Sequence, residues 1–563
     1  METVSLISDM TLLEMCIDDG HCVVDAEGVV WVDAFETPKK EEITRYLRET
    51  ESLCDGQFYA KAPEVRLTNA TRIQSLLDVA KAAREQKSEA ELESEFGDKL
   101  RALCQSAVNN NASDIHIEVH RHQTRLYLRV DGRRERLLTF SNGESAQRLD
   151  QYIGHALAAY TFNLGNSNYS PRLPINDRFE LPLQLKKSQT DGAEATQMVT
   201  STVEWRAAMM PLSHGIKLVL RCLTPLDAPL DLEHMDLLPS QVELLRSKMQ
   251  RRQGIIVLTG PMGSGKSSLV YALLETVDRV ARCCHTLEDP VEFEQDLVTK
   301  TVVEPKRELK EGTGQYLDYT FYAQEQLRQD INITVFGELR EASAAKEFCR
   351  KGETGGIALT TLHANSASGV ASIFTEQLDI PVSVVSSPDL MQLFTHQKLI
   401  RKLCPHCALS LHQAETVYEQ AGLADEYQRK ALQLQTLLPE SLELLRVAHP
   451  EGCAACKGKG EKGRLMVLEL IALEDKDREF INQKDYLGWK RYLQAQGWPD
   501  IRQHALHRIA LGQVDIASAS EEVDGLMPVS AKSIYLQMKK DRQTQLQAAL
   551  EAHRSAASAQ EER

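Results

Sequence analysis

The stretch Gly254-Ile-Ile-Val-Leu-Thr-Gly-Pro-Met-Gly-Ser-Gly-Lys-Ser267 decides the fold of the larger part of this chain. Its first six residues form an apolar run as long as a β-strand, and its last eight fit the pattern G-x-x-x-x-G-K-S. The helical-looking run Ser268-Leu-Val-Tyr-Ala-Leu-Leu274 follows directly. Strand, glycine-rich loop and helix in this order are the context in which the pattern binds phosphate. The sequence therefore predicts a phosphate-binding loop between a buried strand and a helix.

The loop residues suit a nucleotide and its magnesium ion. Glycines allow backbone N–H groups to surround phosphate oxygens, and the N-terminus of the following helix favours negative charge. Lys266 can reach the outer phosphates, and Ser267 can bind Mg²⁺. A glycine-rich turn without a ligand is the alternative. The residues expected to bind ATP are Gly260, Pro261, Met262, Gly263, Ser264, Gly265, Lys266, Ser267 and Ser268.

Two later apolar segments end in side chains that can act on a nucleotide. Ile331-Asn-Ile-Thr-Val-Phe-Gly-Glu338 ends in an acid, which can organise Mg²⁺ or water. Gly356-Ile-Ala-Leu-Thr-Thr-Leu-His363 ends in two hydroxyls and an imidazole. Ligands bind at the carboxyl ends of parallel strands, so we expect these side chains near the loop. The alternatives are a solvated acid and a histidine whose hydrogen bonds are merely structural.

Four of the twelve cysteines form two CxxC pairs, Cys404-Pro-His-Cys407 and Cys453-Ala-Ala-Cys456. Four thiolates in this arrangement suit a tetrahedral metal site, and zinc is the expected ion. Thiols without a metal are one alternative. A thioredoxin-like redox pair is another, although no redox-fold pattern surrounds either pair.

Length and charge limit the class of protein. A chain of 563 residues exceeds what one core usually serves, so two or three domains are expected. The formal net charge of −16 argues against a large sequence-independent contact with nucleic acid. The N-terminal sequence carries acids where an export signal has basic residues, and no apolar run approaches the length of a membrane span. We therefore expect a cytoplasmic protein.

Changes in pattern along the chain predict its domains. Residues 21–33 read as a hairpin, residues 84–99 form a charged segment, and alternating strands begin near residue 97. After Pro229, apolar strands alternate with helical segments, as in a mostly parallel sheet covered by helices. The predicted parts are an N-terminal module at 1–95, a domain at 96–228, a domain at 229–525 with the cysteine insertion at 402–458, and a polar helical tail at 526–563.

Several motifs in this order resemble the secretion and type IV pilus ATPase superfamily, in particular its type II secretion and pilus-extension branch. The resemblance covers roughly residues 97 to 515. The similar segments are Ala112-Ser-Asp-Ile-His-Ile-Glu118, Arg129-Val-Asp-Gly132, Leu287-Glu-Asp-Pro-Val-Glu292, Leu327-Arg-Gln-Asp330, Gly337-Glu-Leu-Arg340 and Thr360-Thr-Leu-His-Ala-Asn365. Asp330 is followed by Ile331-Asn332 where the family usually has Pro-Asp, which indicates a divergent member, such as a type IVb pilus protein.

The resemblance implies a fold and roles for single residues. The fold is α/β: a RecA-like P-loop ATPase domain, preceded by a smaller PAS-like domain and a small N-terminal α/β module, with a zinc-binding insertion. Glu338 would orient the Mg²⁺ shell and the attacking water, Glu288 would be a second carboxylate, and His363 would sense the γ-phosphate. The sequence does not rank Glu288 against Glu338 as the base. Arg206 and Arg221 would be arginine fingers, or else solvated strand arginines.

The resemblance also implies partners. We expect a homo-hexameric ring that uses ATP, Mg²⁺ and Zn²⁺, lies at the cytoplasmic face of the inner membrane, and acts on an inner-membrane platform protein during pilus assembly or type II-like secretion. Membrane association would be peripheral and through partners, with no specific nucleic acid. The zinc cysteines favour the extension branch. The alternatives are a retraction or DNA-transfer motor of the same superfamily and a non-hydrolysing, nucleotide-dependent scaffold.

Overall fold

The computed structural model divides into two compact units, residues 1–228 and 229–563. It describes residues 10–25, 28–34, 36–49, 63–74, 76–77, 89–188, 196–223, 231–289, 291–292, 294–526 and 530–561. Predictions for residues 1–9, for turn residues 26–27 and for residues 84–88 of the charged segment lie outside these ranges. Each unit has its own hydrophobic core.

The elements of the first unit are α1 (Met10–Asp19), β1 (Cys22–Val24), β2 (Val30–Val32), α2 (Lys40–Glu49), β3 (Val65–Leu67), α4 (Glu89–Asn109), β4 (Ala112–Val119), β5 (Thr124–Val130), β6 (Arg133–Arg136), α5 (Gln151–Leu164), β7 (Ile175–Ser188), β8 (Thr196–Leu212) and β9 (Gly215–Cys222). The hairpin predicted at 21–33 is confirmed, because β1 and β2 pair antiparallel with Cys22 opposite Val32. Strand β3 adds in parallel to β2, and side chains from α1 and α2 complete this small core.

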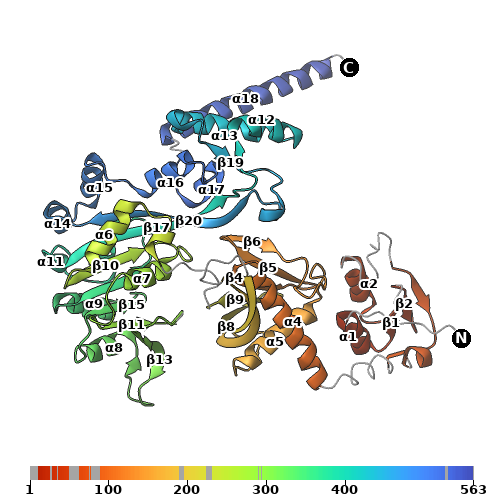
Figure 1. Ribbon diagram of the computed structural model, residues 1–563. Coiled ribbons are helices and arrows are strands. Elements are labelled where there is room, and N and C mark those ends of the chain that lie inside the picture. Colours follow the sequence, from red (N-terminus) through yellow and green to blue (C-terminus); the bar gives the residue numbers. More distant parts are fainter. Residues whose placement is uncertain are drawn as a thin grey trace. The chain divides into compact units, whose positions relative to one another are not determined.

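Strands β4 to β9 form an antiparallel sheet in the order β6-β5-β4-β9-β8-β7. Along β5, buried and half-buried side chains alternate, as expected when one face of a sheet packs on a core. Helices α4 and α5 lie beside this sheet (Figure 1), and the core combines helix residues such as Phe162 of α5 with strand residues such as Trp205 of β8. Helix α4 spans residue 95, where the sequence predicted a boundary, and the PAS-like character of this part stays a prediction.

The strands of the second unit are β10 (Gly254–Thr259), β11 (Cys284–Glu288), β12 (Val298–Val302), β13 (Glu304–Glu308), β14 (Tyr316–Leu317), β15 (Ile333–Phe336), β16 (Ile357–Leu362), β17 (Met391–Leu403), β18 (Leu409–Ser410), β19 (Arg446–Val447) and β20 (Glu461–Ala472). Its α-helices are α6 (Pro239–Met249), α7 (Lys266–Glu275), α8 (Tyr319–Gln326), α9 (Ala342–Glu353), α10 (Val370–Ser372), α11 (Val382–Val385), α12 (Leu411–Gln420), α13 (Ala424–Leu437), α14 (Asp475–Asn482), α15 (Tyr486–Ala495), α16 (Ile501–Ala510), α17 (Ile516–Glu522) and α18 (Ala531–Glu561).

The main sheet of this unit has the strand order β12-β11-β15-β16-β10-β17-β20. Its neighbouring strands run parallel except β17 and β20, which are antiparallel, so the predicted mostly parallel sheet is confirmed. Within β10, Ile256 and Leu258 belong to the core shared with α6 and α7, whereas Ile255 and Val257 belong to the core shared with α9, α14 and α15. The sheet is thus buried on both faces, which explains its continuous apolar strands.

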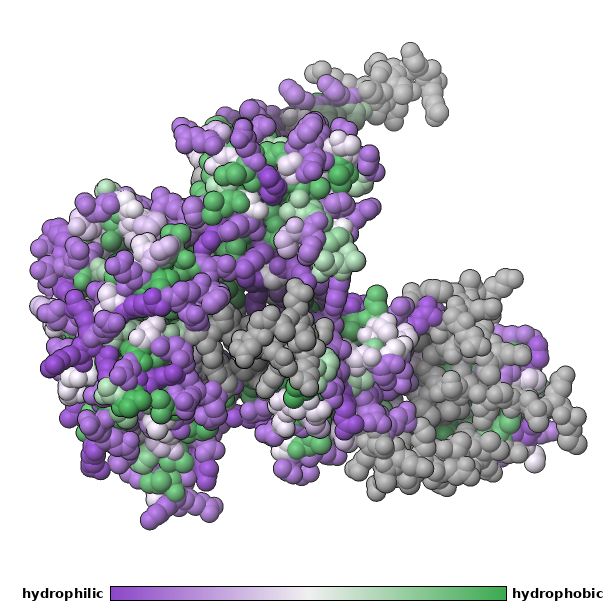
Figure 2. All heavy atoms as spheres, in the orientation of Figure 1, coloured by the Kyte–Doolittle hydropathy of each residue, from purple (hydrophilic) through white to green (hydrophobic). Residues whose placement is uncertain are grey.

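Hydrophilic and hydrophobic residues are mixed on the visible surface of the chain. On the face shown in Figure 2, hydrophilic residues predominate and hydrophobic ones are scattered among them. Among the described residues, no helix combines the length and the apolar composition that crossing a bilayer requires. Helix α18 is long, but its side chains at 531–552 are exposed and include many charged and amide groups.

Candidate nucleotide-binding site and cysteine cluster

The predicted phosphate loop, residues 260–265, joins β10 to α7. Gly260, Gly263 and Gly265 have φ angles of 154°, 73° and 82°, a region that side chains disfavour. A Cβ atom at Gly260 would also lie 2.4 Å from the carbonyl oxygen of Gln397. The glycines of the motif are therefore required by backbone shape and by close packing. The other predicted nucleotide ligands lie on the loop or in the first turn of α7: Pro261, Met262, Ser264, Lys266, Ser267 and Ser268.

Lys266 lies over the loop at the N-terminus of α7. Its Nζ donates to the carbonyl oxygens of Gly260 at 2.9 Å and Pro261 at 3.0 Å. Burial lowers the pKa of Lys266, while the carboxylates of Glu338 and Glu292 act in the opposite direction. The ammonium thus lies in a partly buried position beside the loop and near two acids.

The structure brings Glu338 and His363 together at the loop. Glu338 follows β15, His363 follows β16, and both strands end at the same edge of the sheet as β10. His363 Nε2 lies 3.2 Å from Glu338 Oε1, and His363 Nδ1 lies 3.2 Å from the carbonyl oxygen of Gly260. Arg340 Nη2 lies 2.7 Å from Glu338 Oε2. An acid, an imidazole and the phosphate loop are therefore in direct contact, as their positions at strand ends predicted.

Glu288 has different surroundings. It ends β11 and is buried, and it accepts hydrogen bonds from the hydroxyls of Tyr271 and Thr286. Lys300 Nζ lies 3.7 Å from its Oε1. Burial, followed by the charge of Glu288, raises the pKa of Tyr271. The carboxylate of Glu288 is thus held by buried groups of its own unit.

Arg206 and Arg221 belong to the other compact unit. They are opposite one another on β8 and β9, and Arg221 Nε donates to Asp114 Oδ1 at 2.9 Å. Arg129 Nε lies 3.7 Å from the same carboxylate group. The two predicted arginine fingers are therefore neighbours on one sheet, and their contact with nucleotide stays a prediction.

The four paired cysteines form one cluster whose Sγ atoms all lie within 4.8 Å of one another: Cys404, Cys407, Cys453 and Cys456. Three Sγ pairs are 3.8 Å apart. A tetrahedral zinc site with Zn–S bonds of about 2.3 Å has S–S distances of about 3.8 Å.

Burial opposes ionisation of Cys456, but backbone N–H groups of Cys453 and Gly460 lower the pKa of its thiol to about 6, whereas burial and the neighbouring thiols raise the pKa of Cys407. A thiolate at neutral pH is what a zinc ligand needs. The distances between the four Sγ atoms and the ligand chemistry of four cysteines both fit a zinc ion.

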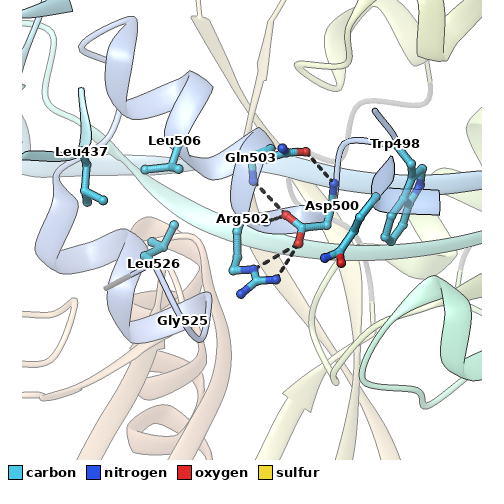
Figure 3. Close-up of a pocket in the computed structure, with 9 residues that line it drawn as sticks. Leu437, Trp498, Asp500, Arg502, Gln503, Leu506, Gly525 and Leu526 are labelled. Carbon is cyan, nitrogen blue, oxygen red and sulfur yellow. Dashed lines mark hydrogen bonds and ion pairs between the residues drawn. The ribbon is translucent and has the colours of Figure 1, made fainter. Parts of the chain in front are cut away.

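A separate pocket lies beside the C-terminal helices of the second unit (Figure 3). Its volume is about 300 Å³. It is lined by Leu437, Gln494, Trp498, Asp500, Arg502, Gln503, Leu506, Gly525 and Leu526. The Asp500 carboxylate accepts from the backbone of Gln503 at 3.1 Å and from Arg502 Nη2 at 2.8 Å. The pocket contains none of the predicted nucleotide ligands, and Asp500 and Arg502 pair with one another within it.

Sequence motifs missed several contacts to the site. Gln397 of β17 donates to the carbonyl oxygen of Ser264, and Arg464 of β20 donates to that of Gly263 at 3.3 Å. Tyr271 on α7 donates to Glu288. Strand β17 contains other polar residues, such as Gln392, His396 and Lys398, so the sequence does not single out Gln397.

The chain is similar to proteins of one known family. A family model described as type II/IV secretion system protein matches residues 89–524. The type II secretion system ATPase E of Vibrio cholerae is 28% identical over 414 residues, which cover 73% of this chain and 72% of that protein. The protein transport protein HofB homolog of Escherichia coli is 31% identical over 389 residues, covering 68% and 72%. The X-ray structure of the Legionella pneumophila ATPase DotB aligns with a TM-score of 0.48 at 16% identity, covering 74% of this chain and 93% of that one. The family match extends over far more than half of the sequence, and the chain belongs to the type II/IV secretion system protein family.

Proposed function

We propose that this protein is an ATP-hydrolysing motor that powers type IV pilus assembly or type II-like secretion. The chain is an ATPase, as expected from its family and from relatives named as ATPases. The observation that carries the proposal is the contact among the phosphate loop, Glu338 and His363. An acid and an imidazole at a phosphate loop are suited to phosphoryl transfer to water.

The residues of the loop bind and orient the nucleotide. Backbone N–H groups of the loop and of the first turn of α7 face the phosphates, and Lys266 moves from the loop carbonyls to the outer phosphates. Ser267 holds the magnesium ion, which neutralises charge on the phosphates when bound. Glu338 orients the attacking water, and His363 connects Glu338 to the loop.

Glu338 is the better candidate for the base than Glu288. The side chain of Glu338 is 24% exposed and that of Glu288 is 8% exposed. Glu288 also accepts hydrogen bonds from two buried hydroxyls. A carboxylate held in that way has less freedom to take a proton from water.

The proposed working form is a homo-hexameric ring. In this form the second unit is a RecA-like ATPase domain, and Arg206 and Arg221 of a PAS-like domain from a neighbouring copy complete each site. The ring acts on an inner-membrane platform protein from the cytoplasmic side, with peripheral membrane association through that partner. The four-cysteine cluster, with zinc, supports the extension branch over retraction or DNA transfer.

Hydrolysis of ATP by the purified full chain tests the proposal. We expect phosphate release that depends on Mg²⁺ and that rises as rings form across a protein concentration series. Light scattering measures ring formation in the same series. Lys266→Ala removes the phosphate contact, and Glu338→Gln retains binding but removes turnover. A wild-type protein that binds ATP in every oligomeric state, even with membranes present, and never hydrolyses it is instead a nucleotide-dependent scaffold.

A further inference from the structure

The phosphate loop is supported by a residue outside every motif, Gln397 of β17. Gln397 is fully buried, and its Nε2 donates to the carbonyl oxygen of Ser264 at 2.8 Å. Strand β17 pairs with β10 as far as Thr259 and His396, so Gln397 lies where β10 passes into the loop. This hydrogen bond fixes one peptide group of the loop.

The direction of that peptide group matters for phosphate binding. In a trans peptide, the C=O and the N–H point in opposite directions. Because the carbonyl of Ser264 points to Gln397, the N–H of Gly265 points away from β17. Loop N–H groups that point away from the supporting strand are those that can meet a phosphate.

The packing around the loop glycines is consistent with this role. A Cβ atom at Gly260 would lie 2.4 Å from the carbonyl oxygen of Gln397, and one at Gly265 would lie 3.6 Å from its Nε2. Gln397 thus contacts both ends of the loop, through its backbone at one end and its side chain at the other.

The hydrogen-bonding capacity of Gln397 is only partly used. Gln397 Oε1 and Ser264 Oγ are both buried and have no hydrogen-bond partner within the described part of the chain. Unpaired buried polar atoms oppose folding, and an apolar side chain at position 397 would avoid one of them. The benefit of glutamine therefore lies in the hydrogen bond to the loop.

We propose that Gln397 is a positioning residue that orients the Ser264–Gly265 peptide for nucleotide phosphate. This inference rests on the proposed function, because it assumes that the loop binds ATP. Gln397 touches the loop and acts on the nucleotide through it.

The first test replaces Gln397 by methionine in the full chain. We expect Gln397→Met to bind ATP about tenfold more weakly, the effect of losing one hydrogen bond that orients a ligand group. Its thermal unfolding midpoint without nucleotide should change little, because the variant loses the hydrogen bond to Ser264 and also removes the unpaired Oε1. Isothermal titration calorimetry and thermal unfolding measure the two quantities.

Gln392 offers a matched control on the same strand. It is also buried, and its Nε2 also donates to a backbone carbonyl, that of Asp389. However, it packs on Gly254, at the other end of β10 from the loop. We expect Gln392→Met to leave the affinity for ATP unchanged.

A second variant, Gln397→Glu, gives a pH signature. An ionised glutamate cannot donate to the carbonyl of Ser264, whereas a protonated one can. We expect its affinity for ATP, relative to the wild type, to recover as the pH is lowered from 8 to 6. A structural defect would not respond in this direction.

The outcomes separate the two proposals. If Lys266→Ala no longer binds ATP while Gln397→Met binds ATP like the wild type, the positioning role of Gln397 is overturned and the proposed ATPase function is retained. If Lys266→Ala also binds ATP normally, the loop is not the nucleotide site and the proposed function fails. If Gln397→Met does not fold, Gln397→Glu decides, because a loss of affinity that is independent of pH contradicts the positioning role.

Discussion

At the scale of single residues, two acids of similar sequence context have different surroundings. Glu288 is the last residue of β11, and Glu338 follows the neighbouring parallel strand β15 by two residues. Glu338 contacts His363 beside the loop, whereas Glu288 accepts hydrogen bonds from Tyr271 and lies near Lys300. The difference arises from which elements cover each strand end, and it predicts different results for the same substitution.

Glu338→Gln and Glu288→Gln should therefore fail in different ways. Glu338→Gln should lower turnover by about 100-fold or more with little change in thermal stability, because it removes the group that orients water. Glu288→Gln should destabilise the fold by about 1–3 kcal/mol, because it removes a buried negative charge 3.7 Å from the Lys300 ammonium. Phosphate release and chemical unfolding of both variants are the measurements. A Glu288→Gln protein of normal stability and no turnover would reverse the assignment.

At the scale of elements, β17 and β20 connect the loop to the cysteine cluster. Strand β17 carries Gln397 and is followed directly by Cys404. Strand β20 carries Arg464 and begins just after Gly460, whose carbonyl accepts from the N–H of Cys404 at 2.9 Å. The cluster thus joins the ends of two paired strands that also contact the phosphate loop.

Zinc should accordingly stabilise this strand pair. We expect one zinc ion per chain by elemental analysis, and Cys404→Ser or a strong chelator should remove it and lower the thermal midpoint by about 5 °C or more. Cys283→Ser is the matched control, since Cys283 is exposed and outside the cluster. Unchanged metal content in Cys404→Ser would show that the cluster is not the zinc site.

Packing of α16 on the sheet predicts a pH dependence. His504 is buried, its Nε2 lies 3.3 Å from Gln241 Nε2, and burial lowers its pKa to about 4. In the unfolded chain this imidazole takes up a proton near pH 6.5, whereas in the folded chain it does so only near pH 4. Burial of the neutral imidazole of His504 therefore contributes fully to stability above pH 6.5, and that contribution is lost as the pH falls towards 4.

Urea unfolding at pH 7.5 and pH 5.0 measures this effect. The wild type should lose about 1–2 kcal/mol more than His504→Gln between the two conditions. Comparing the two proteins cancels the contribution of His396, whose pKa burial also lowers to about 4. Equal losses in both proteins would contradict the assignment to His504.

At the scale of the whole molecule, the residues predicted to act on nucleotide are divided between the two compact units. The phosphate loop, Glu338 and His363 belong to residues 229–563, and Arg206 belongs to residues 1–228. If neighbouring copies complete each site, a copy with a defective loop can still supply its arginine to the next copy. The proposed ring therefore predicts complementation.

Mixing Lys266→Ala with Arg206→Ala tests this arrangement. Each variant alone should hydrolyse ATP at a small fraction of the wild-type rate. A random equal mixture should recover about a quarter of the wild-type activity, because about a quarter of the interfaces combine an intact loop with an intact arginine. No recovery after subunit exchange, with exchange verified by fluorescence energy transfer between copies labelled with different dyes, would place both residues in one copy's site.

The sequence by itself determined the phosphate loop, the mostly parallel sheet, the position of Glu338 and His363 at its edge, and the four cysteines. These features depend on local spacing and on the period of apolar residues, which one sequence displays directly. Only the tertiary structure decided that Glu288 is held by Tyr271 and that Gln397 supports the loop. Such contacts join residues far apart in the chain, and the order of strands in the sheet, with β17 beside β10, brings them together.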